Sequence, residues 1–444
     1  YSGIARVIKT SKGLNLPISG TPDPIISDTP NVTSVSLLAN DFVGMKPTMM
    51  VKVGDIVKRG TKLFEDKKNP GIFFTSPAGG IVKDINRGDK RKFLSVEVEV
   101  SENEDAEYFE YENTSEGLTE LLINTGLWNA FRTRPFNRTP KVGSLPDAVF
   151  VNACDTNPLS VDPYFIIDQD RDDFKNGLEA LTRLFSCPIH CTYQNNNFDI
   201  NVDKINYCQV SGPHPAGLSS THISQLYPVS INKIAWTINY QDIISLGYLL
   251  KNKSLRTHKI IALGGPSVFK PSLISARISA NIDQLTAGKI DNNSRVVSGS
   301  LIYGHASEGI MNYLGFYDSI ISAIPDEAND IFLNWLMPGS NLHSKLNVFS
   351  SSLLKPKKFT FNVSLNGGDR AIVPVGSYDE ILPMDILVPQ LLKALVVGDI
   401  EQAVELGMLE LAPEDLALAS YICPSKYDYC SILANNLNNL YLEQ

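Results

Sequence analysis

Hydrophobic and polar positions change their spacing several times along this chain. Residues 1–100 alternate apolar and polar side chains over short runs that Gly and Pro interrupt, which predicts β-strands. In residues 114–257, extended apolar runs alternate with segments whose apolar residues recur at helical spacing. Residues 258–330 are again rich in extended runs, and helical spacing returns from residue 383. The pattern therefore predicts a multi-domain protein of mixed α/β and β architecture.

The segment 114–257 carries the clearest predictions of single elements. Thr114 or Ser115 can cap a helix, and Gly126 can end that helix in the left-handed conformation. Extended and helical runs then alternate, which favours a Rossmann-like layered α/β domain with helices packed on a sheet. The expected strands are 148–153, 189–193, 205–210 and 234–238, and the expected helices are 173–185 and 240–250.

Two glycine-rich stretches, 53–64 and 75–85, resemble the two halves of a barrel-sandwich domain of the biotinyl/lipoyl type. Glycines allow the tight corners that such short strands need. In carrier domains of this type, a lysine at the tip of the hairpin between the halves is acylated. Lys67 and Lys68 stand at that place, although the following Asn-Pro-Gly fits an ordinary turn. The pattern favours a structural barrel over residues 1–100 and leaves a modified carrier as the alternative.

The next stretches suggest domain boundaries. Residues 101–116 are rich in Asp and Glu and are typical of a solvated linker. Residues 258–330 resemble a β-grasp soluble-ligand-binding module in their spacing, with a helix expected at 278–285 and a strand at 295–298. A small β unit between the α/β domain and the C-terminal part follows from this spacing.

The last part of the chain divides into a connecting segment and a helical domain. Asn366-Gly367-Gly368 is the strongest hairpin signal within residues 331–382. Residues 383–444 predict a C-terminal domain of short helices, because apolar residues return at helical spacing and breakers interrupt them. The expected breaks are Gly398, Gly407 and Pro413.

Composition and charge indicate which classes of binding partner are improbable for this chain. The chain has 444 residues, 43% of them apolar, and a formal net charge of -9. That balance and the absence of long basic runs argue against nucleic acid and anionic lipid as partners. No run approaches the ~18 apolar residues of a membrane span, and the chain as given shows no secretory signal, which predicts a cytoplasmic protein. Six irregularly spaced cysteines suit reduced thiols.

The motifs in the sequence limit the phosphate and metal sites that the chain can contain. Gly-x-Gly-x-x-Gly, the Walker A sequence and His-Glu-x-x-His are absent from the chain, so those phosphate and zinc motifs are excluded. Cys187, His190 and Cys191 form half of a possible metal site, but a buried strand explains them better. The loop 211–222 contains His214 and His222, and its composition fits either a binding loop or a rigid turn with hydrogen-bonded histidines.

Six blocks of the sequence are distinctive when taken together: residues 13–20, 64–71, 132–136, 212–217, 236–242 and 366–370. They resemble the family of A subunits of the sodium-translocating NADH:quinone oxidoreductase, and the match extends from about residue 9 to the C-terminus. The resemblance implies a peripheral subunit on the cytoplasmic face of the bacterial inner membrane. It implies a six-subunit, redox-driven sodium pump that oxidises NADH and reduces ubiquinone, with partners that include an integral membrane subunit.

The same resemblance extends to the flavin-binding subunit of complex I and to the Rnf C subunit. In those relatives, the segment equivalent to residues 126–136 is a glycine-rich loop that holds flavin phosphate. Here bulky side chains replace the glycines and prevent the close backbone approach that a phosphate needs. The resemblance therefore implies no flavin and no NADH site on this chain, and it places flavins and iron–sulfur centres on partner subunits. The replacing residues include Trp128, Phe131, Arg132 and Arg134.

The C-terminal domain shows a second departure from the Rnf-type relatives, which hold an iron–sulfur cluster with four cysteines. The equivalent positions in this chain are Pro413, Leu416, Ala419 and Cys423, so three of the four ligands are missing. No cluster is expected on this chain.

Residues 126–136, which we call the altered loop, have aromatic and guanidinium side chains that suit a quinone, because rings stack on the quinone ring and arginines can donate to its carbonyls. An interface with another subunit explains the same residues equally well. Two other classes remain as alternatives: a soluble NADH-flavoprotein dehydrogenase, which flavin absorbance would reveal, and a lipoyl/biotinyl-type carrier or scaffold protein, which a mass increment on a lysine would reveal. The candidate quinone contacts are Trp128, Phe131, Arg132, Arg134 and Phe136.

Overall fold

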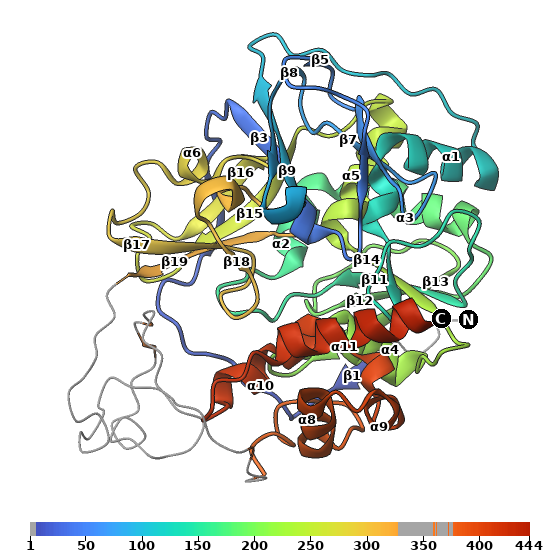
Figure 1. Cartoon of the computed structure of the whole chain (residues 1–444), viewed down its shortest axis with the longest axis vertical. Coiled ribbons are helices and arrows are strands. Elements are labelled where there is room, and N and C mark those ends of the chain that lie inside the picture. Colours follow the sequence, from blue (N-terminus) through green and yellow to red (C-terminus); the bar gives the residue numbers. More distant parts are fainter. Residues whose placement is uncertain (1–5, 327–357, 360, 362–371, 373–375) are drawn as a thin grey trace.

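The computed structural model describes residues 6–326, 358–359, 361, 372 and 376–444. These residues form four sheets and a C-terminal group of helices, arranged around a large shared core (Figure 1). The hairpin predicted at Asn366-Gly367-Gly368 lies outside the described residues.

Two small antiparallel sheets pack together at the top of Figure 1 and enclose an apolar core that includes Leu63, Phe64 and Val82. Gly80 allows one of the close approaches, because a Cβ there would lie 1.8 Å from the carbonyl oxygen of Glu99. The first sheet has the order β3-β9-β8-β5 and the second β4-β6-β7. Their strands are β3 (Ser34–Leu38), β4 (Pro47–Met49), β5 (Ile56–Val57), β6 (Lys62–Asp66), β7 (Phe73–Thr75), β8 (Gly80–Arg87) and β9 (Phe93–Val100).

The third sheet is the centre of an α/β unit, with the order β1-β13-β12-β11-β14-β10. All of its pairings are parallel except that of β10 with β14. The predicted strands 148–153 and 189–193 are confirmed with the same bounds. The strands are β1 (Arg6–Lys9), β10 (Arg132–Arg134), β11 (Ala148–Ala153), β12 (Ile189–Tyr193), β13 (Ile205–Ser211) and β14 (Ala235–Asn239).

Helices cover both faces of this sheet. Val149 and Val151 of β11 pack in the main core, whereas Ala148 and Phe150 pack with Ile223 of α4 on the opposite face. The predicted cap of α1 is confirmed: the Thr114 side chain accepts a hydrogen bond from the Gly117 backbone N–H, and Gly126 ends the helix with φ 80°. The helices are α1 (Ser115–Thr125), α2 (Pro163–Ile167), α3 (Arg171–Leu184), α4 (Ser219–Leu226) and α5 (Tyr240–Asn252).

The fourth sheet has the order β18-β17-β19-β15-β16-β2. Sequence reasoning missed β16 and placed a helix at 278–285, whereas α6 covers only Ile282–Thr286. Ser279 has φ 60° and its carbonyl accepts a hydrogen bond from the Ser36 backbone N–H, so the chain turns there before the helix begins. The strands are β2 (Asp23–Asp28), β15 (His258–Gly264), β16 (Ser272–Arg277), β17 (Ser294–Ser298), β18 (His305–Ala306) and β19 (Ile320–Pro325).

Segments from the N-terminal part of the chain join the units together. Strand β1 pairs with β13 and strand β2 with β16, so the two barrel sheets begin only at Ser34. The acidic stretch 101–116, expected to be a solvated linker, is mostly exposed, but the expectation is wrong for Glu104. Its carboxylate is 15% exposed and pairs with both Arg59 and Arg277, so it links the barrel to the fourth sheet.

The C-terminal helices form a core of their own below the α/β unit (Figure 1). Breaks predicted at Gly398 and Gly407 are confirmed, because both residues adopt left-handed backbone conformations at helix ends. No helix of the described part of the chain is long and apolar enough to cross a membrane. The helices are α8 (Val388–Val397), α9 (Ile400–Glu405), α10 (Ala417–Ile422) and α11 (Tyr429–Glu443), with short 3-10 turns η7 (Met408–Glu410) and η8 (Pro413–Leu416).

Candidate functional site

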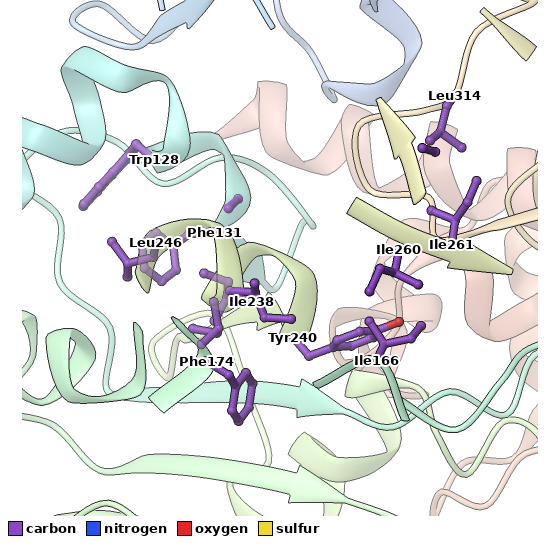
Figure 2. Packing of buried hydrophobic residues seen from close by; sticks show 14 of the residues in the cluster. Trp128, Phe131, Ile166, Phe174, Ile238, Tyr240, Leu246, Ile260, Ile261 and Leu314 are labelled. Atoms are coloured by element: carbon purple, nitrogen blue, oxygen red, sulfur yellow. The ribbon is translucent and has the colours of Figure 1, made fainter. Parts of the chain in front are cut away.

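Two of the predicted quinone contacts, Trp128 and Phe131, belong to the central core. They follow α1 in the 3-10 turn η3 (Leu127–Ala130) and the residue after it, and Figure 2 shows both among the buried side chains. Trp128 is 3% exposed and Phe131 is 0% exposed. Their rings lie 5.5–5.7 Å from the ring of Trp236, and the Trp128 indole N–H donates to the Pro140 carbonyl at 2.9 Å. These rings hold η3 against β14.

The two predicted arginines lie on β10 and point to different neighbours. The Arg132 guanidinium lies 4.2 Å from the centre of the Tyr317 ring. Tyr317 belongs to residues 258–326, which carry most of the fourth sheet and which we call the fourth-sheet unit. Arg134 is fully buried, and its Nε donates to Ser220 Oγ at 3.2 Å. Its Nη2 lies 3.7 Å from a carboxylate oxygen of Glu414 in the C-terminal helical domain. The altered loop therefore contacts both of the later units of the chain.

Phe136 and Arg138 extend this contact with the C-terminal domain. The Phe136 ring lies 5.3 Å from the Tyr441 ring, and the Arg138 guanidinium lies 3.9 Å from the same ring. Arg138 also donates to Asn438 Oδ1 at 2.6 Å. A segment that the sequence assigned to quinone contact or to a subunit interface thus anchors α11 of its own chain.

Asp415 faces Arg134 from the C-terminal side of this contact. Its side chain is 4% exposed, and one carboxylate oxygen accepts a hydrogen bond from the Ala412 backbone N–H at 2.6 Å. Burial, followed by the nearby Glu414 carboxylate, raises the pKa of Asp415 to about 7 despite the opposing effect of Arg134.

Replacing Asp415 by asparagine is expected to remove part of the pH dependence of stability. The unfolded carboxyl ionises near pH 4, whereas the folded one keeps its proton up to about pH 7, so wild-type stability falls as pH rises across that window. The Asp415→Asn variant does not lose stability in this way. Its free energy of unfolding should therefore rise relative to that of the wild type by up to a few kcal/mol between pH 4 and 7. Urea unfolding at several pH values measures the gain. The exposed Asp203→Asn change is the control, and parallel curves for wild type and Asp415→Asn would contradict the expectation.

Both histidines of the loop 211–222 are buried and hydrogen-bonded. His214 Nδ1 lies 3.0 Å from Thr156 Oγ1, and His222 bridges Thr192 Oγ1 at 2.9 Å and the Ala216 carbonyl at 2.8 Å. Burial lowers the pKa of each histidine to about 4, so both are neutral at pH 7. In this arrangement they brace the loop at the end of β13.

A pocket that sequence reasoning missed opens beside the altered loop. Its cavity volume is about 70 Å³, and it is partly open to solvent where the barrel, the α/β unit and the fourth-sheet unit meet. Apolar side chains dominate its wall, and a few polar groups interrupt them, the pattern of small-molecule sites. We call it the junction pocket. Its lining includes Leu37, Phe42, Phe74, Leu127, Leu255 and Phe316, together with Asn129, Ser245, Arg256 and Ser279.

Family models match three regions of the chain: the NqrA N-terminal barrel-sandwich hybrid domain over residues 8–101, the NqrA second alpha/beta domain over 113–255 and the NQRA C-terminal domain over 260–309. The A subunit of the Na(+)-translocating NADH-quinone reductase of Neisseria meningitidis serogroup B is 45% identical, covering 98% of this chain and 99% of its own. This chain belongs to the NqrA family, the A subunits of the Na(+)-translocating NADH-quinone reductase.

Two further NqrA sequences support this assignment. The protein of Hahella chejuensis is 44% identical over 98% of this chain and 99% of its own, and that of Rhodopirellula baltica is 42% identical over 98% of both. One chain of an NAD+-reducing [NiFe]-hydrogenase structure resembles this fold only weakly, with 10% identity, a TM-score of 0.37 and coverage of 74% of this chain and 61% of that one. The expected family and the N-terminal barrel-sandwich domain followed by an α/β domain are confirmed.

Other candidate residues in this member of the NqrA family lie apart from the pocket lining. His190 stacks on Phe150 at 4.9 Å, whereas Cys191, its neighbour in β12, points to the opposite face of the sheet. Among the described residues, no three His, Cys, Asp or Glu side chains converge on a possible metal position. Lys67 and Lys68 are exposed in the turn after β6.

The four positions equivalent to cluster ligands in Rnf-type relatives lie in the C-terminal helical domain. Leu416 and Ala419 are buried in its apolar core, and Pro413 begins η8. The Cys423 sulfur lies 3.6 Å from the Tyr429 hydroxyl. The C-terminal domain thus uses these positions for packing.

Proposed function

We propose that this chain is the peripheral, cytoplasmic-face subunit of a sodium-pumping NADH:quinone oxidoreductase and that it binds quinone in the junction pocket. Family membership supports the first part, since the relatives carry the name of a Na(+)-translocating NADH-quinone reductase. Electrons would reach ubiquinone from NADH through flavins and iron–sulfur centres on partner subunits. The chain itself would hold neither, because the loop and cysteine positions that serve its cofactor-bearing relatives are altered.

The junction pocket is the observation that carries the quinone proposal. Its apolar wall, with Phe42, Phe74 and Phe316, suits the face of a quinone ring, and the hydroxyls of Ser245 and Ser279 can donate to the ring carbonyls. The altered loop contributes through Leu127 and Asn129, whereas Trp128 and Phe131 support that wall from the core. We propose further that residues 258–330, which supply Ser279 and Phe316, form a β-grasp soluble-ligand-binding module.

Two substitutions in the pocket are expected to weaken quinone binding. Leu127→Trp fills the pocket and should abolish measurable affinity for a short-chain ubiquinone, while Ser245→Ala removes one hydrogen bond and should raise Kd about three- to tenfold. Titration calorimetry on the full chain measures both. Leu145→Trp is the matched control, because Leu145 is 78% exposed and lies outside the pocket. Unchanged affinity in both pocket variants would refute the site.

Recovery of the chain from native membranes tests the subunit role. A tag on this chain should bring down integral, flavin-bearing partners, whose visible absorbance then appears in the purified material. The chain separated from those partners should show no flavin absorbance, and its intact mass should show no addition on Lys67 or Lys68. A chain recovered from membranes without partners would contradict the proposal.

A further inference from the structure

The long hairpin β8–β9 of the barrel ends in a concentrated positive charge. Five Lys and Arg side chains and two Asp side chains lie in residues 83–92, which gives this segment a net charge of +3. Since the whole chain carries -9, the remaining residues carry -12. All five cations are exposed, and none forms an ion pair with a residue of the described ranges. The cations are Lys83, Arg87, Lys90, Arg91 and Lys92.

Several cations elsewhere on the surface are paired. Arg171 lies 2.6 Å from a carboxylate oxygen of Asp199, and Lys253 lies 2.6 Å from one of Glu110. An acidic protein has many carboxylates with which to neutralise its lysines and arginines. The hairpin tip keeps its positive charge free of the described carboxylates, so this charge has no role in holding the described fold together.

The backbone conformation of the hairpin tip also indicates that its cationic side chains are not there to stabilise the fold. Lys90 and Arg91 have φ values of 52° and 60°, and the turn is closed by a hydrogen bond from the Gly88 backbone N–H to the Lys92 carbonyl at 2.8 Å. Two adjacent left-handed residues in a hairpin turn favour Asn and Gly, because a Cβ is unfavourable in that conformation. The turn therefore carries two long cationic side chains at positions where its own stability favours other residues.

We propose that the tip of the β8–β9 hairpin, residues 87–92, is a docking surface for an acidic patch on a protein partner. The inference rests on the proposed role of the chain as one subunit of a larger complex. Charge complementarity is the attraction: free cations on an otherwise negative molecule direct an acidic partner to this hairpin and orient it there. The sequence of the tip, Arg-Gly-Asp-Lys-Arg-Lys, has no apolar side chain to insert into a bilayer, and the remaining -12 opposes an anionic membrane. An acidic protein surface therefore fits better than a lipid surface.

The deciding variant removes the charge and improves the turn. Lys90→Asn/Arg91→Gly replaces both left-handed residues by the pair that the turn favours, so its melting temperature should equal or exceed that of the wild type. Its apparent Kd for membranes depleted of this chain should rise about tenfold, since two charge contacts are lost. Wild-type rebinding should weaken with added salt, and the variant should respond less.

Controls separate charge from backbone effects. Lys90→Arg/Arg91→Lys keeps the charge and should rebind like the wild type, and Lys204→Asn makes the same change at another exposed, left-handed lysine and should also rebind normally. Quinone affinity should stay unchanged in the hairpin variant, which separates this surface from the junction pocket. Rebinding of Lys90→Asn/Arg91→Gly with wild-type affinity would overturn the proposal while leaving the subunit role intact. Binding of the wild type, but not the variant, to protein-free phosphatidylglycerol vesicles would replace it by a lipid contact, and a wild type that fails to rebind would overturn both proposals.

Discussion

Replacing Phe131 by alanine is expected to lower the free energy of unfolding by about 3–5 kcal/mol. The side chain is 0% exposed, and its ring lies 5.5–5.7 Å from the rings of Phe185, Trp128 and Trp236. Truncation would remove these edge contacts and leave a cavity between η3, α3 and β14, which rigid elements cannot close. Urea unfolding followed by tryptophan fluorescence measures the loss, because two of the neighbouring rings are indoles.

Phe269→Ala is the matched control for this experiment, since Phe269 is 68% exposed and its truncation should cost less than about 1 kcal/mol. Equal stability of the two variants would show that Phe131 is not the core residue described above. The expected loss also bears on quinone binding. A fall in quinone affinity in Phe131→Ala would follow from the weakened core, because Phe131 does not line the pocket. Substitutions at Leu127 and Ser245 test the pocket directly, because both residues line it.

Replacing Arg134 by methionine is expected to lower the free energy of unfolding by about 3–5 kcal/mol, because it leaves the partly buried Glu414 carboxylate and the buried Asp415 without their cation. Arg134 is 0% exposed, with Glu414 at 3.7 Å and a hydrogen bond to Ser220. Methionine keeps most of the side-chain volume, so the loss reports the charge and its hydrogen bonds. Since Glu414 and Asp415 belong to the C-terminal helical domain, that domain should detach first.

Limited proteolysis and urea unfolding together measure this effect. The variant should be cleaved faster ahead of the C-terminal helices, whereas Arg183→Met, a change at an exposed arginine of α3, should behave like the wild type. Above pH 7, Asp415→Asn should raise the stability of Arg134→Met by more than it raises that of the wild type, because only in the variant has this carboxyl lost its cation. Equal gains from Asp415→Asn in the wild type and in Arg134→Met would contradict a coupling between these two residues.

Elements that depend on local signals were predictable. Strands β11 and β12 are continuous apolar runs between turn residues, and α1 has a capping Thr114 and a terminating Gly126, so each is recognisable within a few residues of sequence. The breaks at Gly398 and Gly407 follow from the same kind of signal, since left-handed backbone favours glycine. Strand β16 was not predicted from the sequence, because its apolar run is short and no Gly or Pro separates it from the residues that lead to α6.

Features that depend on distant contacts were not predictable. Strands β1 and β2 pair with β13 and β16 in two other sheets. The residues near β1 and β2 in the sequence contain no signal that identifies these partners. Glu104 looks like any residue of an acidic linker until folding places it between Arg59 and Arg277. Likewise the junction pocket takes its wall from three separate parts of the chain, so no single motif encodes it.

The altered loop shows both sides of this division. Its sequence alone determined that residues 127–136 contain no glycine, and a Cβ at these positions prevents the close backbone approach that a bound phosphate needs. Only the tertiary structure decided what the replacing side chains do: Phe131 fills the core, and Arg134 reaches the C-terminal domain. Residue type determines which interactions a side chain can make. Which residue it contacts depends on the packing of segments that lie far apart in the chain.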